Sequence, residues 1–417
     1  MLLAAVMLTV GCSDDGVEDR RQMVEVEVAP YASDYTYMAP VNVGTRATEP
    51  TEPSWAPTGY YLYTDLDGAD DIMKSNQNAK IFAFFTKVGS ADPVIRNFRY
   101  VSGTSTWKID EAINASTAEN PYYLYGLVPY GSAEVAIEPY KAPGAEGDGN
   151  YADGAIMTFS GLGSVMSMDP CVIVGAKHGS KVGETIDPVG DNPMKAGDFS
   201  CVFGVSNDVQ ANKDNPNYLF LLFDHLYSAI RFRFCVGDEY AKLRDIHLTK
   251  LEMLAYTDAS CEDEYLRKQF VRTTVTLHKT LDGSSPIVGS IDFIPYGDED
   301  MTKVKIYSGD KEIPHGKYPA DYEDEELRGK KRYTDNMGFV PNVNSYFKLI
   351  STYDVYDTKG NLVRKNCVAE NKIDPFSIFQ TVSLGRRKLY TLNLTIEPTY
   401  LYVLSEPDLD NPTVTVE

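Results

Sequence analysis

The amino-acid sequence predicts an all-β protein with few short helices. From about residue 59, short apolar or alternating runs recur along the chain, and Gly, Pro, Asp or Asn residues bound them. Regular short strands separated by turn residues are typical of a β-sandwich or barrel and not of βαβ units. Helical spacing of apolar residues is rare, and the segment 238–251 is the best candidate for a short helix.

The first half of the chain contains four runs that predict buried strands. Their apolar, aromatic and β-branched residues suit a pleated surface that packs against other elements. The runs are 81–86, 122–130, 155–159 and 171–174. Loops rich in Gly, Asp and Pro separate them, as in 142–154.

A second block of strands follows a segment rich in Pro, Gly, Asp and Asn at 184–217, which is the best candidate for a domain boundary. Its strand-like runs are 218–223, 230–234, 271–278, 287–294 and 388–396. Two further strand-like pieces, 399–404 and 413–417, follow the last of these runs, with a polar spacer containing proline between them. A strand-like tail with no evident partner raises the question of what it pairs with.

Composition and charge exclude several classes of protein. The chain has 417 residues, of which 43% are hydrophobic and 24% charged, which is too apolar for a disordered chain. Its net charge of −21 repels phosphate backbones, so we expect no nucleic-acid partner. The abundance of Tyr over Trp, 29 against 2, is more typical of extracellular β-proteins than of cytosolic enzymes.

The sequence contains no motif that indicates catalysis, a cofactor or a metal. The six cysteines form no CxxC pair, and no His lies at a metal-binding spacing from another His or Cys. There is no nucleophile elbow and no Walker A loop. A Ca²⁺ loop that began at Glu146 would have Tyr151 where Gly is needed and Met157 where Glu is needed. We therefore expect no enzyme, no cofactor and no metal, and at most one disulfide.

The first twelve residues resemble the export signal of a bacterial lipoprotein. They form a charge-free, mostly apolar stretch that is too short for a membrane-spanning helix, which takes about 20 residues, and that fits the apolar part of a secretion signal. Gly11 precedes Cys12 as in a lipobox, although Thr9 stands where Leu is usual and no Lys or Arg precedes the stretch. We therefore expect lipidation at Cys12 and export; the alternative is a buried strand with an incidental cysteine.

Two features at the ends of the chain fit one mechanism. Arg46 lies in a loop flanked by Gly and Pro, a typical site of proteolysis, although an ordinary surface arginine is the alternative. The alternating segments 24–28 and 413–417 lie before this arginine and at the end of the sequence. If cleavage after Arg46 released the first segment, the second segment of a neighbouring molecule would fill the open groove by strand addition. Repeated head to tail, this contact builds a filament; two ordinary edge strands are the alternative.

Together these residues resemble the fimbrillin family, the type V pilins of Bacteroidales bacteria. The matching features follow the family's order over nearly the whole chain. They are Cys12, the site Thr45-Arg46-Ala47, the aromatic strand that ends in Pro129-Tyr130, the segment 223–231 and the terminal strand pair.

The resemblance implies two transthyretin-like Greek-key β-sandwich domains in tandem. The implied segments are a lipoprotein signal at 1–12, a leader at 13–46, and domains at 47–210 and 211–417, the second with a donor-strand tail at 399–417. An Arg-specific protease would cut the Arg46–Ala47 bond, and Val414 and Val416 would belong to the donor strand. His225 is expected to be structural.

The function implied is that of a structural subunit of a cell-surface fimbria that mediates adhesion. Its partners would be other copies of itself, accessory fimbrial subunits, the Arg-specific protease and, before processing, the outer membrane through its lipid. The alternative is a monomeric lipid-anchored surface protein that binds glycan or protein ligands. A tail at 399–417 that packs into its own domain weakens the assembly hypothesis, and an unpaired tail supports it.

We expect Arg46→Ala to block removal of the leader, because an Arg-specific protease requires the arginine side chain at the scissile bond. The measurement is the amino-terminal sequence of the protein isolated from the exporting cell. Arg21→Ala, within the leader, is the control and should leave processing unchanged. Normal processing and fibre assembly of the Arg46 variant would contradict the cleavage site.

Overall fold

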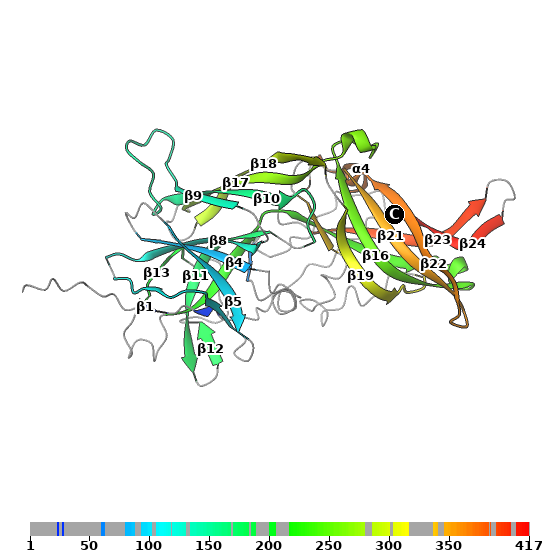
Figure 1. Ribbon diagram of the computed structural model, residues 1–417, viewed down its shortest axis with the longest axis horizontal. Helices are drawn as coiled ribbons and strands as arrows, with labels where there is room; N and C mark the ends of the chain where they lie inside the picture. The colour runs from blue at the N-terminus through cyan, green and yellow to red at the C-terminus, as the bar shows by residue number, and fades with distance from the viewer. Residues whose placement is uncertain are drawn as a thin grey trace, which may run out of the picture.

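The computed structural model confirms the all-β class. Antiparallel sheets dominate it, and the described helices are short (Figure 1). The structure describes residues 23–24, 27–28, 60–62, 80–87, 93–101, 106–117, 119–130, 134–167, 170–182, 185–188, 200–205, 217–279, 286–300, 303–316, 337–340, 346–382, 384, 389–401 and 406–416.

The largest sheet closes on itself. In order of pairing, its strands are β12 (Thr185–Pro188), β11 (Cys171–Val182), β14 (Tyr218–His225), β2 (Glu27–Val28), β6 (Thr106–Ile109), β5 (Val94–Val101), β4 (Lys80–Lys87), β8 (Tyr122–Tyr130) and β13 (Val202–Phe203). β3 (Tyr60–Leu62) pairs with β14, and β1 (Met23–Val24) pairs separately with β7 (Ile113–Asn114). Because β11 pairs with both β14 and β8, the strands from β11 to β8 form a ring.

A four-stranded sheet accompanies this ring and takes two strands from far along the chain. Its order is β18 (Pro286–Asp300), β17 (Lys268–Lys279), β10 (Gly154–Gly163) and β9 (Glu134–Pro139). We call β1–β14 together with the β17–β18 hairpin the first body. The chain therefore does not divide at residue 210 as expected: β14 and the later hairpin pair with strands of the first body. Strand periodicity predicts that a segment is extended, but it does not identify the sheet that the segment joins.

The second body is a sandwich of two four-stranded sheets. One has the order β20 (Met337–Val340), β15 (Ser228–Val236), β23 (Leu389–Leu401) and β24 (Glu406–Val416). The other has the order β19 (Val304–Glu312), β16 (Arg244–Tyr256), β21 (Tyr346–Asp357) and β22 (Leu362–Ile373). β15 and β23, distant in sequence, pair in parallel and join the start of this body to its end.

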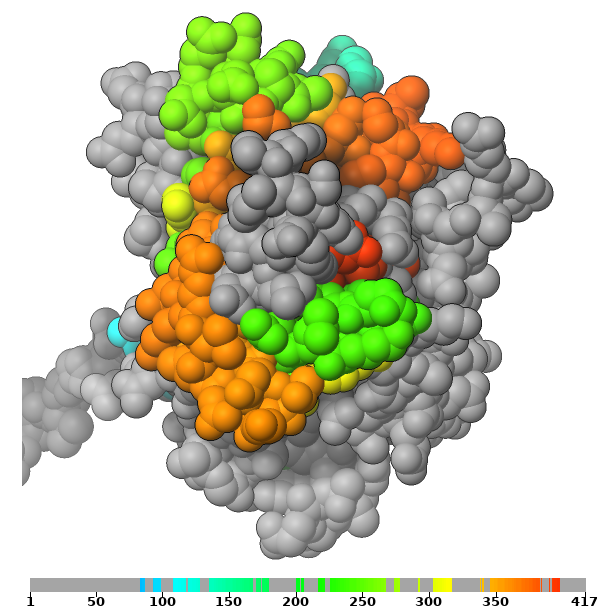
Figure 2. All heavy atoms as spheres, turned by 90° about the vertical axis from the view of Figure 1, so that its right-hand side faces the viewer, coloured from blue at the N-terminus to red at the C-terminus, as the bar shows by residue number. Residues whose placement is uncertain are grey.

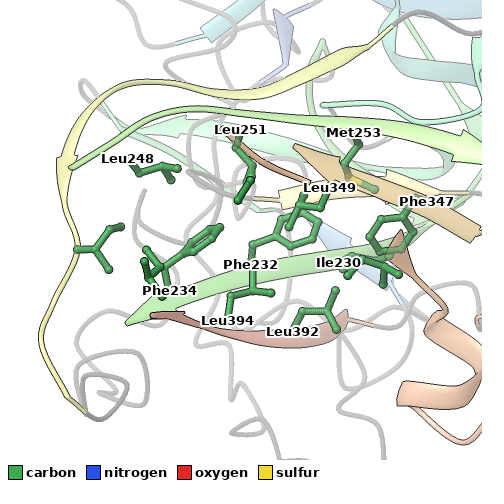
Figure 3. Packing of buried hydrophobic residues seen from close by; sticks show 14 of the residues in the cluster. Ile230, Phe232, Phe234, Leu248, Leu251, Met253, Phe347, Leu349, Leu392 and Leu394 are labelled. Carbon is green, nitrogen blue, oxygen red and sulfur yellow. The ribbon is translucent and has the colours of Figure 1, made fainter. Parts of the chain in front are cut away.

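The core of the second body lies between its two sheets (Figure 3). Alternate residues of β15, including Phe232, point toward Leu251 and Met253 of β16 and toward Phe347 of β21. The Phe232 and Phe347 rings meet edge to face, with centroids 6.3 Å apart at 80°. Period-two alternation in β15 and β23 thus places one apolar face of this sheet in the core.

The intervening residues of β15 are buried as well. Arg231 and Arg233 alternate with the core residues, and their exposed fractions are 2% and 1%. The alternation of apolar residues and arginines in this segment is typical of a strand with one apolar and one polar face, but the structure buries both faces. Tertiary packing, which a local pattern does not contain, decides the burial of the second face.

The helix expected at 238–251 is wrong for most of its length. Helix α3 covers only Asp238–Ala241, and the strand β16 begins at Arg244. The pairing of β16 shifts by a β-bulge between Leu248 and Lys250. Because of this shift, the buried residues of β16 include Ile246, Leu248, Leu251 and Met253. Their uneven spacing resembles that of the apolar face of a helix. The other described helices are a 3₁₀ turn at Asp263–Tyr265 and α4 at Pro375–Ile378.

The cysteines of the described residues are buried thiols. They are Cys171, Cys201, Cys235, Cys261 and Cys367. Buried thiols of this kind pack as small apolar groups, so the fold rests on its cores and not on a disulfide framework.

We expect Phe232→Ala to lower the free energy of unfolding by about 3–5 kcal/mol, because it removes a fully buried ring from the second core. Chemical denaturation measures this change. Val382→Ala is the control; the Val382 side chain is 92% exposed, and the change should stay within about 0.5 kcal/mol. Similar losses for both variants would contradict the assignment of this core.

Candidate functional site

The segment before Arg46 contributes a strand to the middle of the largest sheet. β2 pairs in parallel with β14, with Glu27 opposite Tyr218 and Val28 opposite Leu219. On its other side β2 pairs antiparallel with β6, with Val28 opposite Trp107. β2 is therefore the strand that closes the ring between β14 and β6. The alternating Val and Glu residues of this segment favour an extended conformation.

A second contact holds the same segment at β1, which two residues separate from β2. β1 pairs antiparallel with β7, with Met23 opposite Asn114 and Val24 opposite Ile113. Ile113 is buried, and the hydroxyl of the buried Tyr122 donates a hydrogen bond of 2.9 Å to the Asn114 carbonyl. The receiving strand thus belongs to a tightly packed part of the first body.

The strands that flank β2 contribute buried apolar residues. Leu219 of β14 is buried, as is Ile109 at the end of β6. Deeper in the ring, the Phe85 ring lies 6.2 Å from that of Phe98 and 6.1 Å from that of Tyr122, centroid to centroid. We call the gap that loss of β2 would leave between β14 and β6 the strand slot. An empty strand slot would have unpaired backbone edges on two sides, which is a template for another strand.

β24 forms the opposite end of the molecule from β1 (Figure 1). It pairs antiparallel with β23, with Val414 opposite Ile396 and Val416 opposite Leu394. Ile396 and Leu394 are fully buried, so the two valines lie in register with buried residues of β23. Among the described strands β24 has β23 as its one partner in the sheet, which makes it an edge strand. It also lies against β22 of the other sheet.

The tail differs from the expected one in extent and in pairing. Residues 406–412 of the expected spacer are part of β24, and β23 continues to Leu401 after a bulge at Pro398 and Thr399. Pro412 lies opposite Pro398, and proline is tolerated in an edge strand such as β24. The tail is thus paired within its own chain, which is the arrangement that weakens the assembly hypothesis.

The turn of the β21–β22 hairpin reaches the surface at the right-hand end of the view in Figure 1. Figure 2 shows this end, with the orange surface of the β21–β22 hairpin beside the green surface of the segment that contains α3. At the hairpin turn Asp357 accepts hydrogen bonds from the Asn361 side-chain amide and from the backbone N–H groups of Asn361 and Lys359, which lowers the pKa of its carboxyl. These local bonds hold the turn, so its carboxylate has a structural role.

The remaining predicted site residues are placed as follows. Cys12, Arg46 and Ala47 lie outside the described residues. His225 ends β14 with its backbone opposite Cys171, and its structural role stays a prediction. The sequence alternation marked the segment 24–28 as a strand, but no sequence signal identified β14 and β6 as its neighbours.

Two histidines outside these segments have carboxylate partners in the second body. His247 Nδ1 lies 2.7 Å from Asp310 Oδ1, and His315 Nε2 lies 2.9 Å from Asp245 Oδ1. Both contacts join β16 to β19 or to the loop that follows it, so they link neighbouring strands. In the part of the chain that the structure describes, no three His, Cys, Asp or Glu side chains are grouped to hold a metal. The helices described there also include none that is long and apolar enough to cross a membrane.

The buried phenol of Tyr125 has a packing role in the first body. Tyr125 of β8 is fully buried, and its hydroxyl donates a hydrogen bond to the Tyr151 carbonyl. Burial raises the pKa of Tyr125 well above its ordinary value. The neutral phenol is therefore the favoured form, which suits a packing role and not that of a base.

We expect Val28→Pro to speed amide hydrogen exchange in the strands that flank β2, because proline lacks the backbone N–H of a strand with two neighbours. Loss of about one ladder hydrogen bond predicts roughly five- to ten-fold faster exchange at 107–108 and 218–219. Glu146→Pro, in the exposed loop between β9 and β10, is the control and should leave these amides unchanged. Unchanged exchange in the Val28 variant would contradict the position of β2.

Comparison with known proteins finds similarity among solved structures. No family model matches the chain, and no curated protein matches its sequence. A crystal structure of a "putative cell adhesion protein" from Bacteroides uniformis is similar over 82% of this chain and 91% of that chain, with 7% sequence identity and a TM-score of 0.32. At this identity and TM-score the neighbour does not indicate a function for this chain. The proposed function therefore rests on the strand pairing.

Proposed function

We propose that the chain is a structural subunit of a cell-surface fimbria that polymerises by strand exchange and mediates adhesion. In this proposal the precursor is a lipoprotein anchored through Cys12, and an Arg-specific protease cuts between Arg46 and Ala47. Removal of the leader withdraws β1 and β2 and opens the strand slot. The terminal strand of a neighbouring copy, or of an accessory subunit, then fills it.

The position of β2 is the observation that carries the proposal. A strand that precedes the expected cleavage site lies between two strands that follow it, with Glu27 and Val28 paired on both sides. Withdrawal of an edge strand would merely shorten a sheet. Withdrawal of β2 would open the ring above buried side chains such as Leu219, so a replacement strand would regain both backbone pairing and apolar contact.

The positions of the two segments support a linear assembly. β1 belongs to the first body and β24 to the far end of the second body along the longest axis (Figure 1). A contact between different surfaces of two copies is heterologous, and it propagates unless the rotation closes a ring. Donation from one end to the other therefore favours a fibre over a closed dimer.

The pairing of β24 with β23 must be given up before donation. The parallel pair β15–β23 already joins the first strand of the second sandwich to its last strand but one, so β24 is an addition at the sheet edge. An edge strand leaves a sheet without separating the two packed sheets. Val414 and Val416 can pair either with β23 of their own chain or with the strand slot of a neighbouring copy. Exchange therefore requires that the strand slot bind β24 more tightly than β23 does.

The same pairing favours a second candidate function. A tail that stays on β23 gives a monomeric, lipid-anchored surface protein that binds glycan or protein ligands. The two functions are separated by treating the purified full-length chain with an Arg-specific protease. SDS-resistant ladders support strand exchange, and a single monomer band supports the monomeric binder.

We expect deletion of 413–417 to stop fibre growth after leader removal, because the donor loses its alternating valines. Two double variants of the full chain sharpen the test. Val414→Asp with Val416→Asp should abolish the ladder, since these residues lie in register with the buried Ile396 and Leu394. Thr413→Asp with Thr415→Asp adds the same charge at the alternate positions and should retain ladders. Normal ladders from the valine variant would contradict the donor-strand role.

A further inference from the structure

We infer that the β17–β18 hairpin locks the two bodies into one cooperative folding unit. The hairpin lies in sequence between β16 and β19 of the second body, yet it pairs with β10 of the first body. The inference holds whether the chain assembles into fibres or remains a monomer.

The ladder between β10 and β17 is long and apolar on its inner side. It runs from Gly154 opposite His278 to Gly163 opposite Phe270, with one bulge. Met157 lies opposite Val275 in this register, and both side chains are fully buried. Ala155 and Leu277, also opposite each other, are buried in the same way. β17 therefore supplies core residues to the first body and is not merely attached to its surface.

A second contact runs in the opposite direction. Val165, two residues after β10, is buried in the core cluster of the second body. Just before β15, the Tyr227 hydroxyl donates a 2.8 Å hydrogen bond to the Gly163 carbonyl, and the Leu226 N–H donates one of 2.9 Å to the Pro170 carbonyl. The first body thus contains β17, which lies in sequence between strands of the second body. The second body in turn buries Val165, which lies in sequence between β10 and β11 of the first body.

The chain that runs from β16 of the second body to the hairpin is held by hydrogen bonds up to the start of β17. The Arg267 N–H donates a 3.0 Å hydrogen bond to the Ala255 carbonyl of β16, and β17 begins at the next residue, Lys268. The Arg267 side chain is buried, and burial lowers the pKa of its guanidinium group. Motion of one body relative to the other would therefore break backbone pairing or expose buried groups.

These contacts couple the stabilities of the two bodies. Unfolding the second body removes the anchor of β17 and the cover of Val165, and loss of β17 leaves β10 with an open edge above Met157. Independent domains joined by a linker would each unfold with their own free energy. The interlocked arrangement predicts one transition.

Native-state hydrogen exchange of the full chain tests the inference from both sides. Phe347→Ala weakens the core of the second body, and amides 124–125 of β8 report on the first body. We expect protection at these amides and at 349–353 of β21 to fall by the same factor, at least ten-fold. A fall confined to β21 would overturn the inference.

The reciprocal variant is Val275→Asp, which places a carboxylate in the ladder core of the first body. It should lower protection in β21 and β8 equally, whereas Val382→Asp at an exposed position should change neither. If the Asp variant does not fold, Val275→Ala gives a smaller effect that must still be equal in the two bodies. Unequal effects would show that the bodies unfold separately.

Discussion

Backbone pairing at sheet edges is the constraint on which this structure depends. An all-β chain leaves a row of N–H and C=O groups at every strand that lacks a neighbour, and an open edge above an apolar core is especially unfavourable. In the first body the ring is complete because β2 fills the place between β14 and β6. Two residues, Glu27 and Val28, therefore decide whether the largest sheet is closed.

The second body meets the same constraint in a different way. β15 and β23 close its sandwich by parallel pairing, and large apolar residues fill the space between its sheets. β24 remains at the edge, with Val414 and Val416 in register with buried residues of β23. One body thus takes a strand from the leader, and the other carries an additional strand at its margin. The proposed exchange connects these two properties.

Local patterns predicted most strands but not their partners. The runs at 81–86 and 230–234 fall inside β4 and β15, because period-two alternation and apolar content depend on the segment alone. The bulge in β16 was missed because it makes the spacing of buried residues resemble that of a helix. Arg231 and Arg233 are buried by distant packing. For the site, alternation identified both terminal segments, whereas the place of β2 depends on contacts across much of the chain.

The late position of the β17–β18 hairpin in the sequence affects the order in which the protein is completed. β10 ends at Gly163, but the strands that complete its sheet extend to Asp300. A polypeptide that emerges amino-terminus first, from a ribosome or across a membrane, therefore leaves one edge of β10 unpaired until β15, β16 and the β17–β18 hairpin have followed. Partly emerged chains present an open, apolar strand edge throughout that interval, which is when such chains are prone to aggregate. The sheet that contains β10 thus stays incomplete during synthesis or transport, because it is finished only by residues that arrive late.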